Sequence, residues 1–144
     1  MKKILVSACL LGKNVKYNGG NNYNELVISL NNEYEIIPIC PEVEGGLPCP
    51  RIPSEIKDDK VINKEGIDVS EEFNLGANLA LEKAKANNPE FIVLKDGSPS
   101  CGVNYIYDGT FTSTKINKMG VTSSLLKKEG FNILSEIDLE NKRS

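Results

Sequence analysis

Three of the four cysteines in this 144-residue chain lie at or just after the end of a short apolar run. Cys9 follows residues 4–6, Cys40 follows residues 36–39, and Cys101 lies in a Ser-Pro-Ser-Cys-Gly stretch shortly after residues 91–94. If the three runs are parallel strands of one sheet, their carboxyl ends share an edge, which is where open α/β sheets bind ligands. The pattern therefore predicts that three thiols distant in sequence meet at one site.

Thiolates are ligands for soft metals, and iron–sulfur clusters are normally held by about four of them. We interpret Cys9, Cys40 and Cys101 as candidate ligands of such a cluster, which would leave one iron without a protein ligand. Their spacing does not match the Cys-x-x-Cys run of ferredoxins, so two alternatives stay open. One is a closed, structural zinc site that includes Cys49. The other is that the cysteines pack as small buried hydrophobic residues.

The sequence contains no histidine, the usual general base near neutral pH. Acid and base chemistry would therefore fall to carboxylates, hydroxyls, lysines or thiolates. Glu42, two residues after Cys40, is a candidate proton carrier, and Ser98 and Ser100 are candidates to hold a substrate. Arg51 could bind a substrate oxygen. The alternative roles are a solvated carboxylate, two turn-forming serines and a surface arginine.

Composition excludes several classes of protein. The net charge is −3 with acidic and basic residues interspersed, so the chain lacks the basic stripe needed to bind extended nucleic acid. No apolar run approaches the roughly 18 residues of a membrane span. We expect a soluble, cytoplasmic protein whose thiols are reduced rather than paired in disulfides. The sequence carries no signal for an oligomeric state.

The hydrophobic pattern predicts four strands and four helical segments. The strands are expected at 3–8, 34–39, 91–94 and 131–134, and the helices at 22–31, 70–87, 119–129 and 136–142. Residues 40–53 contain four prolines and two glycines and are expected to be an ordered loop without regular structure. Ser70 is expected to cap its helix, residues 60–63 and 66–69 to form a small hairpin, and Asp108-Gly109 to form a second hairpin turn.

Alternating strands and helices are typical of βαβ units with right-handed crossovers. We predict one α/β domain over residues 1–144: a three-layer sandwich with a four-stranded, mainly parallel sheet and a small β-hairpin. The expected strand order is 2-1-3-4. The second strand is placed outermost because Pro38 cannot donate a backbone hydrogen bond. Cys9 and Cys101 would then flank the crevice between the first and third strands.

Several motifs together resemble the bacterial family catalogued as domain of unknown function 523. These are Ser7-Ala8-Cys9-Leu10-Leu11-Gly12, Tyr17-Asn18-Gly19, Cys40-Pro41-Glu42, Gly45-Gly46-Leu47-Pro48 with Pro50-Arg51, Asp68-Val69-Ser70, Ser98-Pro99-Ser100-Cys101-Gly102 and Ile106-Tyr107-Asp108-Gly109. The resemblance covers nearly the whole chain. Members of that family include thiouracil desulfidases, which carry a 4Fe-4S cluster on three cysteines and remove sulfur from a thiolated pyrimidine.

The resemblance implies that Cys9, Cys40 and Cys101 ligate a 4Fe-4S cluster whose open iron takes the substrate sulfur. It also implies that Glu42 and the two serines lie beside a small thiolated nucleobase or related thioamide. The expected activity is that of a C–S bond hydrolase or lyase, converting thiouracil to uracil and hydrosulfide. A different class remains open: a zinc- or cluster-binding accessory module for sulfur transfer or transfer-RNA thiolation. A third is a small-molecule-binding domain with incidental cysteines.

Overall fold

A four-stranded parallel sheet forms the centre of the computed structural model, which describes residues 1–143. Its strands are β1 (Lys2–Ser7), β2 (Tyr34–Ile39), β5 (Ile92–Leu94) and β8 (Ile133–Ser135). They lie in the order β2-β1-β5-β8, which confirms the expected order. β2 is an edge strand, where Pro38 is tolerated.

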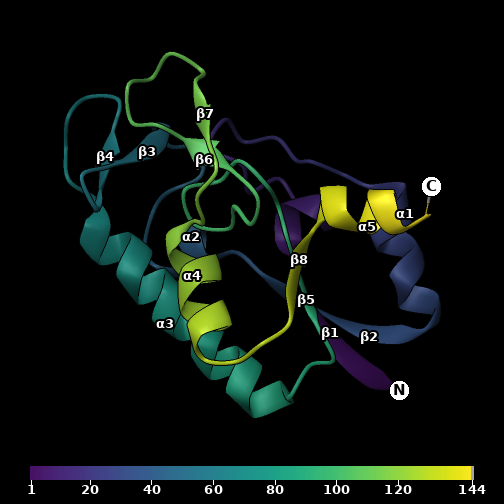
Figure 1. Ribbon diagram of the computed structural model, residues 1–144. Coiled ribbons are helices and arrows are strands. Elements are labelled where there is room, and N and C mark those ends of the chain that lie inside the picture. The colour runs from purple at the N-terminus through teal and green to yellow at the C-terminus, as the bar shows by residue number, and fades with distance from the viewer. Residues whose placement is uncertain (144) are drawn as a thin grey trace.

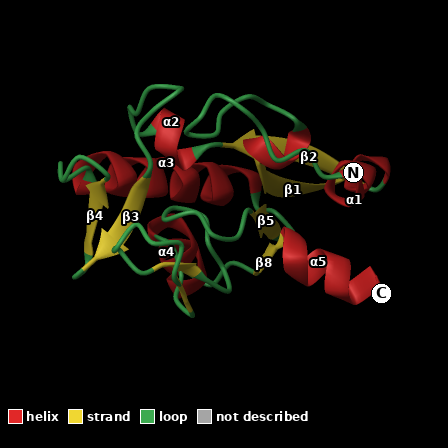
Figure 2. Ribbon diagram, turned by 90° about the horizontal axis from the view of Figure 1, so that it is seen from above, coloured by secondary structure: helices red, strands yellow, loops and turns green. Residues whose placement is uncertain are grey.

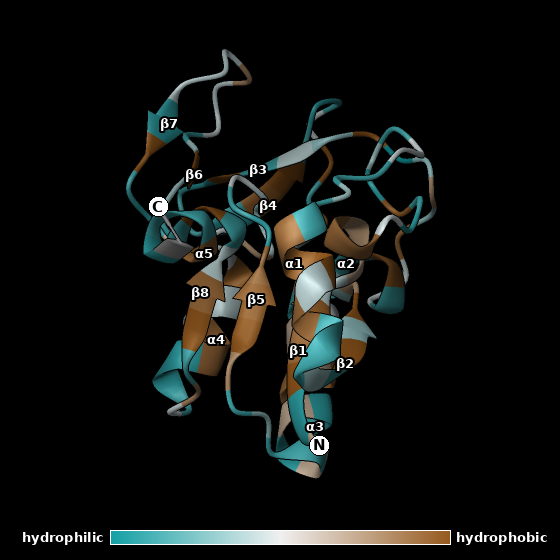
Figure 3. Ribbon diagram, turned by 90° about the vertical axis from the view of Figure 1, so that its right-hand side faces the viewer, coloured by the Kyte–Doolittle hydropathy of each residue, from teal (hydrophilic) through white to brown (hydrophobic). Residues whose placement is uncertain are grey.

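Helices cover both faces of the sheet, as expected for a three-layer sandwich (Figure 1). The helices α3 (Ser70–Asn87) and α4 (Val121–Lys128) cover one face, and α1 (Glu25–Ser29) and α5 (Glu136–Arg143) cover the other. Successive strand residues point to opposite faces. Leu5 accordingly packs in the α3–α4 core, whereas its neighbours Ile4 and Val6 pack in the α1–α5 core. The strands are correspondingly hydrophobic along much of their length (Figure 3).

Two antiparallel hairpins lie at the end of the sheet away from the N-terminus (Figures 1 and 2). They pair β3 (Ser54–Lys57) with β4 (Lys60–Asn63), and β6 (Ile106–Tyr107) with β7 (Lys115–Ile116). The first hairpin extends our prediction for residues 60–63, because their main partner is β3, while residues 66–69 also make backbone hydrogen bonds with them. Both turn residues of this hairpin, Asp58 and Asp59, have positive φ, as a tight hairpin turn requires. The predicted partner contributes a single bridge between Ile62 and Asp68.

Short helical turns follow the first two strands. The 3₁₀ helix η1 (Ala8–Leu11) continues from β1, and a single α-helical turn, α2 (Pro41–Glu44), continues from β2. A second 3₁₀ helix, η2 (Leu30–Asn32), extends α1. The prediction that residues 40–53 contain no regular structure is therefore wrong at its start, because a proline fits the first position of a helix. No helix of the described chain is long and apolar enough to cross a membrane.

Candidate functional site

A cavity of about 410 Å³ lies at the carboxyl end of the sheet. Cys9, Cys40 and Cys101 all line it. Cys9 lies in η1 after β1, Cys40 precedes α2 after β2, and Cys101 lies in the loop after β5. Since β1, β2 and β5 are parallel and adjacent, their ends bring the three thiols to one place. The three cysteines singled out from the sequence thus line one cavity at this edge of the sheet.

Each of the three thiols is held in a protein environment that disfavours the free thiolate. Burial raises the pKa of Cys9, against the opposing effects of an Asn22 hydrogen bond and the Lys95 charge. Burial likewise raises the pKa of Cys40 and, most strongly, that of Cys101. A metal bound to such thiols must displace their protons, so metal binding here releases protons.

The backbone around Cys40 is fixed by a neighbouring glutamate. The Glu44 carboxylate accepts a hydrogen bond of 2.8 Å from the Cys40 N–H and forms a 2.7 Å ion pair with Lys83 of α3. The start of α2 is thereby tied to a long, well-packed helix. This anchoring fixes the position of Glu42, which lies in the same helical turn.

Glu42 and Ser98 form a hydrogen-bonded pair on the cavity wall. The Ser98 hydroxyl donates to Glu42 Oε2 at 3.2 Å and accepts bonds of 3.0 Å from the backbone N–H groups of Ser100 and Cys101. Because both N–H groups point at the hydroxyl oxygen, the hydroxyl proton is directed toward the carboxylate. The pair therefore couples a proton acceptor to the loop that carries Cys101.

Ser100, the second predicted serine, is placed differently. Its side chain is fully buried and lies 2.7 Å from the Thr122 hydroxyl of α4. Ser100 is not among the residues that line the cavity. Its hydroxyl joins the Ser-Pro-Ser-Cys-Gly loop to α4 and contributes to the position of Cys101 rather than facing the cavity.

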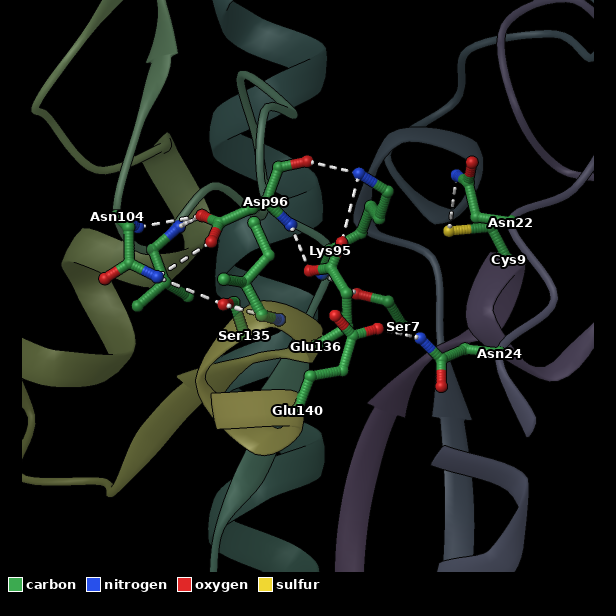
Figure 4. Close-up of polar contacts among 12 residues, drawn as sticks. Ser7, Cys9, Asn22, Asn24, Lys95, Asp96, Asn104, Ser135, Glu136 and Glu140 are labelled. Atoms are coloured by element: carbon green, nitrogen blue, oxygen red, sulfur yellow. Dashed lines mark hydrogen bonds and ion pairs between the residues drawn. The ribbon is translucent and has the colours of Figure 1, made fainter. Parts of the chain in front are cut away.

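Asn22 and Lys95 are among the residues of the cavity wall that were not predicted from the sequence. Asn22 Nδ2 donates to the Cys9 sulfur at 3.4 Å (Figure 4). Lys95 Nζ lies 3.2 Å from Glu136 Oε2 and donates to the Asp96 carbonyl at 2.7 Å. Burial by itself would lower the pKa of Lys95, but the Glu136 carboxylate raises it above its ordinary value. A permanent positive charge thus lies beside Cys9.

Cys49 lies apart from the other three thiols. It is exposed, its sulfur donates to the carbonyls of Asn14 and Lys16 at 3.1 and 3.4 Å, and it does not line the cavity. Within residues 1–143, no three His, Cys, Asp or Glu side chains form a group that could hold a metal ion. A four-cysteine zinc site therefore does not match the structure.

The donor set does fit a cluster. A ligand set of three thiols, without histidine or carboxylate, is the set expected for iron in a sulfide-bridged cluster. In a cluster each protein ligand binds a separate iron, so the thiols need not converge on one ion. The cavity they share gives room for an inorganic core and for a small ligand beside it.

The fold and site define an α/β protein with a cysteine-lined pocket at the carboxyl end of its parallel sheet. Comparison with known proteins then gives the family: residues 4–138 match the 2-thiouracil desulfurase family, and the chain belongs to it.

Two relatives extend over nearly the full chain. The solved structure of the 4Fe-4S-dependent thiouracil desulfidase TudS is similar with a TM-score of 0.91 and 41% identity, covering 98% of this chain and 95% of that one. The uncharacterized protein YbbK of Bacillus subtilis (strain 168) is 40% identical over 148 residues, covering 96% of this chain and 98% of that protein. Our prediction of a thiouracil desulfidase-like family member is confirmed.

Proposed function

We propose that this protein is a 4Fe-4S-dependent desulfidase that removes sulfur from a thiolated pyrimidine such as thiouracil, giving uracil and hydrosulfide. The observation that carries the proposal is the meeting of three thiols with the Glu42–Ser98 pair on the wall of one cavity. Family membership and the likeness to TudS support it. We place the reaction in the cytoplasm, where free thiols stay reduced.

Cys9, Cys40 and Cys101 would hold the cluster. When bound, it supplies a Lewis-acidic iron without a protein ligand, which can polarise a thiocarbonyl. Exchange of that sulfur for the oxygen of water is a hydrolysis without net oxidation or reduction. The side chains of the site therefore need to orient the ring and move protons.

Glu42 is suited to the proton transfers. The sequence has no histidine to act as general base, so the Glu42 carboxylate takes the role of proton acceptor. It lies on the cavity wall. Ser98 donates its hydroxyl proton to one carboxylate oxygen and thereby holds the Glu42 carboxylate in place on the cavity wall. Tyr105 and Tyr107 also line the cavity and present aromatic surfaces against which a pyrimidine can pack.

The decisive experiment is anaerobic reconstitution with iron and sulfide, followed by metal analysis and assay of hydrosulfide release from 2-thiouracil and 4-thiouracil. We expect about four irons per chain and release of hydrosulfide. Cys101→Ala should lose both the brown colour and the activity. Glu42→Gln should keep the cluster absorbance and lose most turnover.

Three results would overturn the proposal. Zinc in place of iron, or a stable cluster without hydrosulfide release from any thiolated base, would favour an accessory role in sulfur transfer. An active, colourless Cys101→Ala variant would exclude the cluster from the reaction.

A further inference from the structure

Arg51 is a charged residue buried on the wall of the cavity. Its side chain is 7% exposed, although it lies in a proline-rich loop at the surface of the molecule. Burying a guanidinium is unfavourable unless its charge is paired and its N–H groups are bonded. The partners of Arg51 therefore indicate its role.

Three nitrogens of the guanidinium point to three different acceptors. Nε donates to Glu42 Oε1 at 3.1 Å, Nη1 to the Pro48 carbonyl at 3.3 Å, and Nη2 to the Val15 carbonyl at 2.9 Å. The Arg51 backbone N–H also donates to the Tyr17 carbonyl, at 2.6 Å. The side chain thus joins the loop after β1, the loop after α2 and the Glu42 carboxylate.

This arrangement decides how Glu42 can act. Arg51 occupies Oε1 with a group that cannot take up a proton, because a guanidinium stays charged throughout the working pH range. Oε2 is left facing the Ser98 hydroxyl. Each carboxylate oxygen therefore has a separate partner, and the Glu42 carboxylate is held in one orientation on the cavity wall.

We propose that Arg51 is the positioning residue for the proton carrier Glu42, and not a ligand of the substrate. The inference rests on the proposed function. It requires arginine in particular, because the planar fork of a guanidinium serves three acceptors in fixed directions and the single ammonium of a lysine cannot. Loss of Arg51 should lower the rate of the proton-transfer step while leaving substrate binding nearly unchanged.

A double-mutant cycle on the reconstituted enzyme tests this. We expect Arg51→Gln to lower kcat by about 10- to 100-fold, the range of a misplaced acid–base group, with KM changed by less than about threefold. In a Glu42→Gln background the same substitution should change kcat by less than about threefold, because the group it positions is already gone. Arg51→Lys should give an intermediate kcat.

Folding and cluster content are checked on each variant by thermal melting and by absorbance per iron. If Arg51→Gln does not fold or does not retain the cluster, Arg51→Lys is carried through the same cycle. Lys85→Gln is the matched control: it removes an ion pair between Lys85 of α3 and Glu129, two residues that do not line the cavity and do not contact Glu42. It should change kcat by less than about twofold in both backgrounds.

Two results would overturn the inference. Equal losses of kcat from Arg51→Gln in the wild-type and Glu42→Gln backgrounds would mean that Arg51 acts independently of Glu42. A raised KM with unchanged kcat would mean that Arg51 binds the substrate. Failure of the proposed function can be distinguished from failure of this inference. It would be seen in the hydrosulfide assays of the wild-type and Glu42→Gln enzymes, before Arg51 is altered.

Discussion

The hydrogen bond from Asn22 to Cys9 should affect the reduction potential of the proposed cluster. The Asn22 side-chain N–H donates to the Cys9 sulfur, and Asn22 lines the cavity. Hydrogen bonds to a ligand sulfur stabilise the more negatively charged, reduced form of an iron–sulfur cluster and so raise its reduction potential. Asn22 should therefore influence the cluster without contacting the substrate.

We predict that Asn22→Leu, which removes the donor at similar volume, lowers the midpoint potential of the cluster by tens of millivolts. An anaerobic redox titration followed by electron paramagnetic resonance measures the change. Asn21→Leu is the control, since the exposed Asn21 amide donates to Asn14 and not to a cysteine. An unchanged potential in Asn22→Leu would contradict the assignment.

The sequence predicted that three thiols share one sheet edge, and all three line the cavity there, but it could not separate Ser98 from Ser100. Both flank the same proline, and the difference arises from Thr122, which lies on a helix more than twenty residues later. Lys95 could have been found, because it directly follows the third predicted strand and so lies at the same edge as the cysteines. Asn22 had no such signal, since its contact with Cys9 depends on the path of the intervening loop.

Packing of α2 on α3 controls where Cys40 and Glu42 lie. The Pro41 carbonyl of α2 sits directly against Gly76 of α3, so closely that a side chain at position 76 would overlap it. The two helices therefore approach each other through a glycine. Glycine is required at position 76 because the helices approach closely there, and not because of its backbone conformation, since its φ is not positive.

We predict that Gly76→Ala lowers the free energy of unfolding by about 2 kcal/mol, in the range typical of an overpacked contact. It should also reduce desulfuration, because α2 must move away and take Glu42 with it. Urea unfolding and the activity assay measure the two effects. Asn74→Ala, at an exposed position of the same helix, should be neutral or slightly stabilising. An unchanged free energy of unfolding in Gly76→Ala would contradict the prediction, because it would show that α2 can move away from α3 without loss of stability.

Asp96 holds the loop that carries Ser98 and Cys101. Its carboxylate accepts bonds of 2.8 Å from the backbone N–H groups of Val103 and Asn104 and from the Asn104 side chain (Figure 4). Burial by itself disfavours the charged form. The hydrogen bonds, including one with Ser135, outweigh it and hold the pKa of this carboxyl below its ordinary value. Ionised Asp96 therefore stabilises the folded protein.

We predict that Asp96→Asn costs about 2 kcal/mol of unfolding free energy at pH 7, because an amide N–H₂ then faces other donors. The pKa is lowered on folding, so the contribution is present above the unfolded pKa and is lost as the pH falls through the folded one. The difference from wild type should stay constant from pH 7 to about pH 4 and shrink below that. Urea unfolding across this range measures it, with the exposed Asp58→Asn as control. A difference that persists at the lowest pH would contradict the prediction.

Long periodic segments were predictable, and short polar ones were not. The apolar face of α3 fixed that helix from the sequence, yet Ser70 does not cap it. Val69 occupies the capping position, while the Ser70 hydroxyl accepts a hydrogen bond from the Val61 N–H of β4. A partner in another element thus outweighed the local preference.

Across the whole molecule, the topology of the sheet accounts for most of what the sequence could predict about the site. Parallel strands with helical crossovers must end at one edge, so residues that follow them meet there whatever their separation in the chain. The shape of the cavity was not predictable. It depends on Arg51 and on the two hairpins, which contribute Glu55 of β3 and Ser113 of the β6–β7 loop to the wall.

The proposed cluster ligands lie beyond the ends of three different strands, in η1, at the start of α2 and in the loop after β5, so binding of the cluster should stabilise the entire fold. A ligand that binds only the folded state, present at 100 times its dissociation constant, adds about 2.7 kcal/mol. For a chain of this length that corresponds to a rise in Tm on the order of 10 °C. The added stability should act through the loops that the cluster joins.

We therefore predict that anaerobic cluster loading raises Tm by this amount, that a chelator reverses it, and that Cys101→Ala shows no rise. Hydrogen exchange should slow most in the loops after β1, β2 and β5, because these become linked through the cluster. The segments around α4 and the β6–β7 hairpin contribute no ligand and should change less. Slower exchange spread evenly over the chain, or an unchanged Tm in protein that has bound iron, would mean that the three thiols do not hold the cluster together.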